Sequence, residues 1–422
     1  MRHAIGFGFV LLLFGCGGSK RDSISAVSGA SPIPAASPMP AATPDAGGSS
    51  NPCDGLRPGP PDQPVTFKET LAISQGAMSP LGDGQGNVLI GTAGGFGQLG
   101  YSIHAPDGGV LGSADFPPSQ TASLTVPLAS GFAGIIRLPF MNGPSLIRMT
   151  PDGGIQNAAA ANEQGHTAAD PRGGLVLLTA DALTSYDDDL SPRFTVPLQL
   201  TSVGLAQLGV DVTGNILVLF AANVNAGMYD QMGFWVDRDG HQGTAFPVEE
   251  QLVIDENIFA LAPDVRGGLF LWHSICDFAG TDMCTSQWER RFPPLSTSPE
   301  PAPEWLASRG GATTFPLVGP TPKLELIHGQ SGYALTGVPQ PACGFEVVTA
   351  DGVSCGVIDF SSRLSNLTSS GALLIAKTGG HPACHSSLDV GRDGTVLSTS
   401  TVPCIDNDNC PVSYDWFPGY FR

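Results

Sequence analysis

Short stretches in which apolar and polar residues alternate recur from about residue 80 to the end of the chain, each bounded by Gly, Asn or Asp. Alternation with a period of two is the pattern of a β-strand, and the bounding residues are those that form tight turns. The chain holds 55 Gly and 37 Pro in 422 residues, which disfavours long helices. The pattern therefore predicts an all-β body.

Two turn patterns repeat along this body. The first is an Asp, a Gly-Gly or Gly-Asn turn and a β-rich strand, with clear copies at Asp83–Gly91, Ala169–Thr179, Val210–Phe220 and Ala262–Trp272 and weaker ones at Ala129–Leu138, Gly329–Val338 and Ser369–Lys377. The second is a strand ending in an Asp-Gly hairpin, as in SIHAPDGGVLG, RMTPDGGIQ, FWVDRDGHQG, EVVTADGVSCGV and DVGRDGTVLS. A repeat of roughly 40 residues predicts a β-propeller of about seven four-stranded blades. Six or eight blades also fit, and a pair of β-sandwiches is the alternative.

The N-terminus has the pattern of an export signal. Arg2 and His3 precede an unbroken apolar run over 4–14, and Gly15 is a small residue at the expected cut site. A basic start, a short apolar run and a small residue define a signal peptide. The run is shorter than the roughly 20 residues of a membrane span, so we expect residues 1–15 to be removed.

Leu13-Phe14-Gly15-Cys16 resembles the lipobox of bacterial lipoproteins. The resemblance implies that Cys16 carries acyl chains such as palmitate and becomes the mature N-terminus. Two or more chains hold a protein firmly on a membrane. Gly17 after the cysteine implies the outer membrane, with the body facing the periplasm or the exterior. An ordinary signal peptide is the alternative.

Residues 16–64 are rich in Ser, Ala and Pro and contain few large apolar residues, which predicts a disordered tether. The propeller-like body is expected over 65–422, with an irregular Pro-rich insertion at about 276–323. A propeller ring needs closure, and we expect Val65–Ile73 to pair into the last blade near Tyr414–Phe421.

Charge excludes two classes of partner. Asp and Glu number 38 against 19 Lys and Arg, a formal net charge of −19. Such a body would be repelled by nucleic acid and by anionic lipid headgroups. The membrane is therefore expected to be a partner only through the N-terminal lipid, and an envelope protein or glycan is the partner class left open.

Apart from Cys16 the chain has an even number of cysteines, which predicts disulfides in an exported protein: Cys53, Cys276, Cys284, Cys343, Cys355, Cys384, Cys404 and Cys410. Spacing favours local pairs at Cys276–Cys284 and Cys404–Cys410. A direct bridge between Cys343 and Cys355 is disfavoured, because the hairpin at 351–352 would place neither opposite the other. The remaining connectivity stays open.

No motif assigns a catalytic residue, a metal ligand or a resident cofactor. Asp406 and Asp408 are weak Ca²⁺ candidates, since they lack the Gly and Glu of an EF-hand loop, and Asp187-Asp188-Asp189 is a similar acidic turn. His381 and His385 have a metal-ligand spacing only on a helix, which Pro382 opposes. A solvated turn or a disulfide is the better interpretation of each.

The repeat, D-x-x-G-N before a strand and Asp-x-x-Gly after one, resembles propellers of the NHL and gluconolactonase type. That resemblance implies a divalent metal in the axial channel, but the matching positions are turns and assign no ligand. We therefore expect an exported, lipid-anchored envelope protein acting as a binding or structural module rather than an enzyme. The alternative is a propeller hydrolase, lactonase or lyase with a metal or polar site in the central channel.

Overall fold

The computed structural model describes part of the chain: residues 51–53, 56, 65–72, 81–83, 85–93, 99–105, 107, 109–116, 121–137, 145–160, 165–225, 227–253, 257–277, 283–309, 312–314, 324–327, 332–335, 344–359, 364–367, 373–377, 386–390, 396–400 and 409–417. The chain divides into two units, Met1–Ser31 and Pro32–Arg422, and every described residue belongs to the second. In this part of the chain no helix is both long and apolar enough to cross a membrane.

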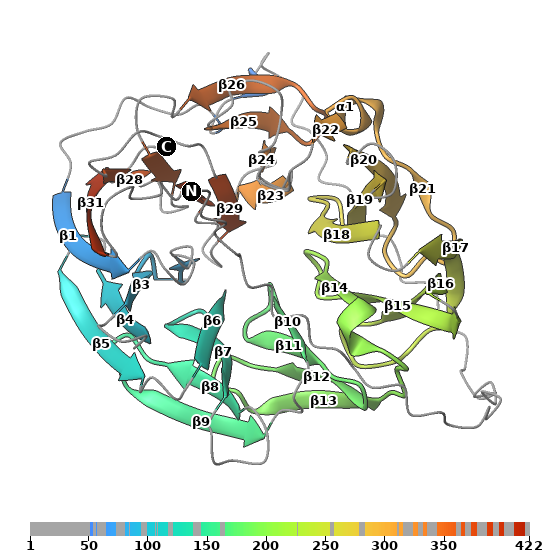
Figure 1. Ribbon diagram of the computed structural model, residues 1–422, viewed down its shortest axis with the longest axis horizontal. Coiled ribbons are helices and arrows are strands. Elements are labelled where there is room, and N and C mark those ends of the chain that lie inside the picture. Colours follow the sequence, from blue (N-terminus) through green and yellow to red (C-terminus); the bar gives the residue numbers. More distant parts are fainter. Residues whose placement is uncertain are drawn as a thin grey trace, which may run out of the picture. The chain divides into compact units, whose positions relative to one another are not determined.

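The second unit is a β-propeller, as predicted. Among the described residues, seven antiparallel sheets follow one another in a ring (Figure 1), six with four strands and one with five. From the axis outward, blade 1 consists of β2 (Leu81–Gly82), β3 (Val88–Ala93), β4 (Leu99–His104) and β5 (Val110–Phe116). Blade 2 consists of β6 (Thr121–Pro127), β7 (Phe132–Arg137), β8 (Ser145–Met149) and β9 (Ile155–Ala160). Blade 3 consists of β10 (His166–Ala169), β11 (Leu175–Leu178), β12 (Ala182–Tyr186) and β13 (Pro192–Pro197).

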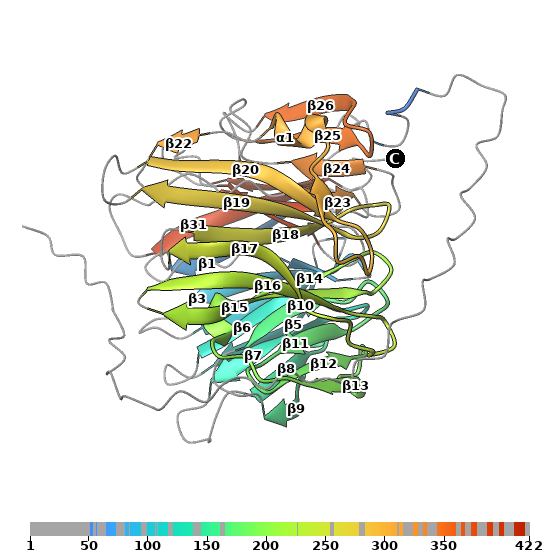
Figure 2. The same ribbon diagram turned by 90° about the vertical axis from the view of Figure 1, so that its right-hand side faces the viewer.

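Blades 4 and 5, seen from the rim in Figure 2, have the longest strands. Blade 4 consists of β14 (Gln207–Val210), β15 (Ile216–Asn225), β16 (Met228–Val236) and β17 (Phe246–Val253). Blade 5 consists of β18 (Asn257–Pro263), β19 (Leu269–Asp277), β20 (Met283–Phe292), β21 (Glu300–Pro301) and β22 (Ala312–Thr314). The 3₁₀ turn η3 (Val203–Leu205) leads into blade 4. Blade 6 consists of β23 (Leu324–Ile327), β24 (Gly332–Leu335), β25 (Gly344–Thr349) and β26 (Ser354–Asp359). Blade 7 consists of β27 (Leu364–Leu367), β28 (Leu373–Lys377), β31 (Asn409–Phe417) and β1 (Val65–Ala72).

The two repeated turn patterns occupy fixed places in the blades. Turns of the first pattern join the first and second strands of a blade, and those of the second pattern, with the exception of DVGRDGTVLS, join the third and fourth. Both kinds lie on one face of the ring, because successive strands are antiparallel. In the Gly-Gly copies the second glycine is required: Gly174 and Gly268 have positive φ, and a Cβ would lie 2.0 Å from the carbonyl oxygen of Tyr186 or 2.2 Å from that of Phe292.

Strand β1 closes the ring, which confirms the pairing expected for the start of the body. It lies antiparallel to β31 from Val65 opposite Trp416 to Ala72 opposite Asn409. β31 also pairs with β28. The outermost strand of blade 7 therefore comes from the beginning of the body and the other three from its end.

One hairpin is not the blade element that its sequence predicts. DVGRDGTVLS was expected to end a blade, but β29 (Ser386–Val390) and β30 (Val396–Ser400) form a separate two-stranded sheet. Its backbone approaches β2, β23 and β27, the innermost strands of blades 1, 6 and 7. An Asp-Gly turn specifies a tight hairpin, but it does not specify the sheet that the hairpin joins.

The Pro-rich stretch in 276–323 divides the fourth strand of blade 5. β21 pairs with one part of β20 and β22 with another, and the helical turn α1 (Glu304–Ala307) lies between them in sequence. Leu306 is fully buried in the cluster between blades 5 and 6. Arg309 holds Glu346 of blade 6 with its Nε 2.8 Å from Oε2. The insertion thus connects the two blades.

Apolar side chains form a separate cluster between each pair of consecutive blades from 1 to 6. Between blades 4 and 5, for example, Leu217 and Trp235 of blade 4 pack in one cluster with Leu269 and Phe292 of blade 5. Alternate residues of a strand point to opposite faces, so each inner strand serves two such clusters. Stability is therefore distributed around the ring.

Candidate functional site

Four aspartates in turns of the first pattern are completely buried. We call Asp83, Asp170, Asp211 and Asp264 the turn aspartates; each has no exposed surface. In each, Oδ1 accepts a hydrogen bond from the backbone N–H two residues on, at 2.9–3.0 Å. This carboxylate cap holds the tight turn that the next strand requires.

Three of the four turn aspartates also connect neighbouring blades; the fourth, Asp170, pairs with Arg172 and Arg193 of its own blade. Oδ2 of Asp83 accepts the N–H of Gly131 in blade 2 at 2.8 Å. Oδ2 of Asp211 accepts the N–H of Gly268 in blade 5 at 3.1 Å. Oδ1 of Asp264 accepts the hydroxyl of Tyr333 in blade 6 at 2.9 Å. The repeated Asp is therefore a latch between consecutive blades as well as a turn residue.

Charge at the latches differs from blade to blade. Burial raises the pKa of Asp83 above its usual 3.8, because its backbone and amide donors only partly offset the loss of solvent. Burial also acts to raise the pKa of Asp264, but hydrogen bonds from the Arg266 backbone, Arg291 and Tyr333 outweigh it and lower that pKa. The carboxylate of Asp264 is thus the centre of an ionic cluster, with Arg291 Nε 2.6 Å from Oδ2.

The described residues contain no group of three or more His, Cys, Asp or Glu side chains suited to a metal ion. In the acidic turn, Asp187 and Asp189 both accept the N–H of Ser191. The Ser191 hydrogen bonds lower the pKa of Asp189 to about 2. Asp188 accepts the N–H groups of Ala129 and Gly174. The other metal candidates, His381, His385, Asp406 and Asp408, lie outside the described residues.

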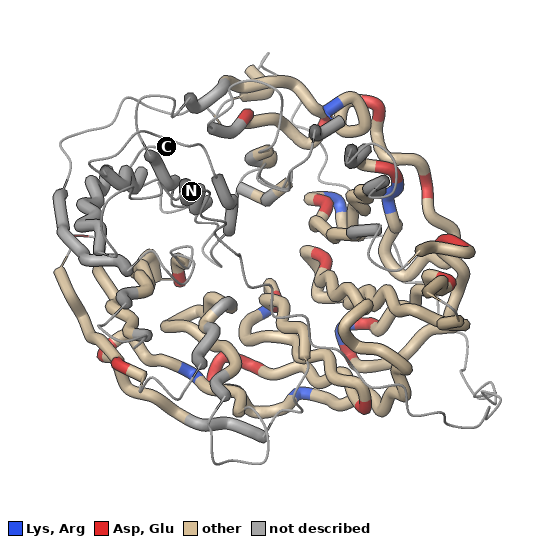
Figure 3. Tube along the Cα trace, in the orientation of Figure 1, with Lys and Arg blue, Asp and Glu red and all other residues tan. Residues whose placement is uncertain are grey.

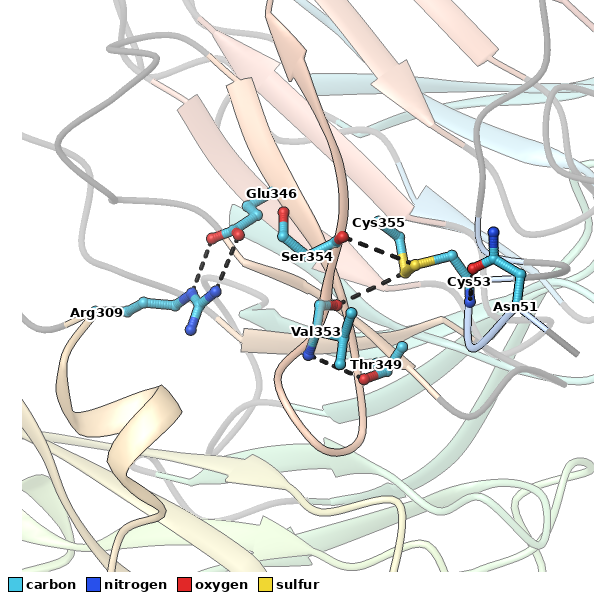
Figure 4. The surroundings of a disulfide bond; sticks show 8 residues. All are labelled: Asn51, Cys53, Arg309, Glu346, Thr349, Val353, Ser354 and Cys355. Atoms are coloured by element: carbon cyan, nitrogen blue, oxygen red, sulfur yellow. Dashed lines mark hydrogen bonds and ion pairs between the residues drawn. A yellow bond between two sulfur atoms is a disulfide. The ribbon is translucent and has the colours of Figure 1, made fainter. Parts of the chain in front are cut away.

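In the part of the chain that the structure describes, a disulfide joins Cys53 to Cys355, with the two Cα atoms 5.3 Å apart (Figure 4). It joins the segment before β1 to the start of β26 in blade 6. Leu56 is also buried, and a Cβ on Gly332 of blade 6 would lie 2.6 Å from its Cδ1. Part of the stretch predicted as a tether is therefore fixed to blade 6.

The other cysteines are described less fully. Cys276 and Cys284 are opposite one another in the β19–β20 pairing, which is the arrangement that a local bridge needs. That bridge stays a prediction. Cys410 lies on β31 opposite Leu71, while Cys343, Cys384 and Cys404 are outside the described residues.

Loss of the disulfide should lower stability. The bond spans 302 residues, and closing a long loop restricts the unfolded chain strongly, so Cys53→Ser is expected to reduce the free energy of unfolding by about 2–5 kcal/mol. Cys355→Ser should have the same effect, because it removes the same bond. Scanning calorimetry of the wild type and both variants would measure this, and an unchanged melting temperature in either variant would contradict it.

A polar cluster lies between blades 4 and 5. His273, only 3% exposed, places Nδ1 3.1 Å from Oε1 of Glu289. The ring of His273 stacks on Phe259, with centroids 4.4 Å apart. Gln287 also donates to the same Glu289 oxygen at 2.9 Å. The hydrogen bond from His273 is the main cause of the lowered pKa of Glu289.

Blade 4 also carries an exposed apolar surface, which we call the apolar tip of blade 4. It consists of Val224, Met228 and Val253, at the end of the β15–β16 hairpin and of β17, with exposures of 38–45%. Asp230 supports the tip with two hydrogen bonds. Its carboxylate accepts one from Nδ2 of Asn223 at 2.7 Å and one from the backbone N–H of Gln251 at 3.0 Å.

The shape of this tip is conformationally costly. Asn223 and Gln251 have φ of 52° and 58°, which non-glycine residues rarely adopt. Both are held by the single carboxylate of Asp230, whose pKa is lowered first by the hydrogen bond from Asn223. Strain of this kind persists where surrounding contacts fix it and is often found at binding sites.

Comparison with known proteins gives likenesses of fold only. No protein-family model matches the chain, and no curated protein matches it significantly. Among solved structures, a gluconolactonase from Xanthomonas campestris has 12% identity and a TM-score of 0.34, covering 86% of this chain and 98% of its own. The Pan2 WD40 domain of Neurospora crassa has 11% identity and a TM-score of 0.33, covering 85% and 96%. A eukaryotic initiation factor has 11% identity and a TM-score of 0.41, covering 86% and 100%.

Sequence reasoning found the turn aspartates as a repeated motif but not as latches, because their partners lie a whole blade away. It assigned no role to His273, because its partner, Glu289, is on the next strand. The only available signal was the polar residue itself, directly after the apolar residues 269–272. The apolar tip of blade 4 has no sequence signature at all.

Proposed function

We propose that this protein is exported and lipid-anchored in the cell envelope, and that its propeller binds another envelope protein rather than acting as an enzyme. The observation that carries the proposal is the Cys53–Cys355 disulfide. Disulfides of this structural kind form in oxidising compartments, and this one fixes the chain to blade 6 at the end of the predicted tether.

The apolar tip of blade 4 is the proposed binding surface. Its neighbours in sequence and in the sheet are acidic: Asp230 is two residues from Met228, and Glu249 and Glu250 are on β17. β17 lies at the right-hand rim in Figure 1, and Figure 3 shows acidic positions, in red, along this rim. A second copy of this chain would carry the same charge and be repelled. The surface therefore fits a protein segment with apolar side chains flanked by Lys or Arg.

A protein fits this surface better than a glycan does. The large apolar side chains exposed in the described part of the chain are all aliphatic or Met: Val110, Leu111, Ile155, Val224, Met228, Val253 and Val353. Sugar rings are usually held against flat aromatic faces, and no such side chain is exposed among them. Aliphatic contacts with a basic rim are typical of protein recognition.

Lipidation is tested at Cys16. In cells grown with labelled palmitate, the wild-type protein is expected to take up label and to sediment with membranes. Cys16→Ser should lose both properties, since no other residue in the lipobox can be acylated. Ser19→Ala is the control and should behave as the wild type. An unlabelled, soluble wild-type protein would contradict the anchor.

The binding surface is tested by replacing Val224, Met228 and Val253 together with Ser. Burying each such side chain contributes about 1.5–3 kcal/mol, so the yield of an in-cell cross-linked partner should fall about tenfold or more. A triple Ser variant at Val110, Leu111 and Ile155, exposed apolar residues of blades 1 and 2, is the matched control. Equal losses in the two variants, or none, would contradict the assignment of this surface.

A further inference from the structure

A buried polar side chain between blades 4 and 5 has its hydrogen-bonding groups unmatched. Gln231 on β16 is completely buried. Neither its Nε2 nor its Oε1 meets a hydrogen-bond partner among the described residues. A primary amide buried in this state is strongly unfavourable, since it has given up its hydrogen bonds to water.

Gln231 faces blade 5. Side chains alternate along β16, and Tyr229 and Trp235, an even number of residues away, both pack in the cluster between blades 4 and 5. On the facing sheet, Leu269 and Leu271 of β19 belong to the same cluster, so His273 also points into this interface.

The strand pairings place Gln231 of blade 4 at a similar level, along the strands, to the His273–Glu289 pair of blade 5. Gln231 is opposite Glu249 in the β16–β17 pairing. The side chain of Glu249 forms an ion pair with Arg290 of blade 5. Arg290 directly follows Glu289, the partner of His273. The amide of Gln231 and the His273–Glu289 pair therefore lie across the same part of the interface.

Solvent access differs across this cluster. Glu289 is 16% exposed, whereas His273 is 3% exposed and Gln231 is fully buried. Solvent therefore reaches the carboxylate more readily than the imidazole or the amide.

We propose that Gln231 and the His273–Glu289 pair form an internal binding site for a small neutral group that both accepts and donates hydrogen bonds, which is the chemistry of a hydroxyl. The group accepts a hydrogen bond from Nε2 of Gln231 and donates one to Oε1. Two sources supply this chemistry: a structural water molecule, and a hydroxyl of a small organic ligand. The site does not depend on the proposed partner.

A crystal structure of residues 51–422 at a resolution that shows ordered water distinguishes the sources. An isolated density peak within hydrogen-bond distance of both amide atoms of Gln231 identifies water. Continuous density reaching the amide identifies an organic hydroxyl, and either result supports the site. Protein side chains as the partners of both amide atoms would overturn it.

Gln231→Met gives an independent test, because Met has nearly the same shape but no amide. If the amide holds a hydroxyl group, the variant loses those hydrogen bonds and its melting temperature should fall by ~2–6 °C. If the amide is unsatisfied, Met removes the unfavourable burial and the melting temperature should rise, which would overturn the proposal. Gln242→Met, an exposed position of the same blade, is the control and should leave the melting temperature unchanged.

Discussion

Replacing Asp264 with Ala is expected to reduce the free energy of unfolding by about 3–5 kcal/mol, because the substitution removes a fully buried carboxylate that pairs with Arg291 and accepts the hydroxyl of Tyr333. Arg291 Nε lies 2.6 Å from this carboxylate and is itself only 14% exposed. The Tyr333 hydroxyl of blade 6 would lose its acceptor as well. Calorimetric or denaturant unfolding of the purified body would measure the change.

The matched control is Asp239→Ala, in a turn of blade 4. The Asp239 side chain is 66% exposed and only 4.0 Å from Arg238, so its loss should change stability by no more than about 0.5 kcal/mol. Equal effects of the two substitutions would show that the turn aspartates do not latch the blades.

The same carboxylate predicts a loss of stability in acid. The pKa of Asp264 is lowered in the folded protein from 3.8, so its ionisation stabilises the fold above the unfolded value and this contribution is lost as pH falls through the folded pKa. We expect the difference in stability between the wild type and Asp264→Asn to shrink as pH falls below about 4. A difference that stays constant with pH would contradict this.

Replacing β1 with a flexible Gly-Ser segment of equal length should lower the melting temperature by about 10 °C or more. Along its eight residues β1 pairs with β31, and each backbone hydrogen bond contributes about 1 kcal/mol net. Cys53 is retained in this variant, so the disulfide is still able to form and only the strand pairing is lost.

The control for β1 is the same replacement at residues 37–44, in the stretch predicted as a tether. This change should leave the melting temperature as it is, since that composition offers little apolar surface to bury. A β1 variant that melts with the wild type would show that the ring closes without this strand.

Local turn chemistry explains why the blades could be predicted. Asp-x-x-Gly-Asn and Asp-Gly turns are held by hydrogen bonds between residues only a few positions apart. In the copy Asp211–Asn215, for example, the Asp211 carboxylate accepts the N–H groups of Thr213 and Asn215. The closing strand was also predictable, because a propeller ring needs a partner for its last blade and Val65–Ile73 has the alternation of a strand.

Long-range partners could not be predicted in the same way. The Cys53–Cys355 bond joins residues 302 positions apart, and spacing alone favours local pairs. Gln231 and His273 both face the interface between blades 4 and 5, which no periodicity in one strand reveals. The candidate sites were found at positions such as these, where two sheets pack.

The most direct test of the account is the divalent-metal content of residues 51–422, purified without chelators from an oxidising compartment. The account assigns the propeller a binding role, so it predicts only trace metal. One tightly held metal ion per chain would contradict it. That result would instead favour a metal-dependent hydrolase or lactonase with its site in the central channel.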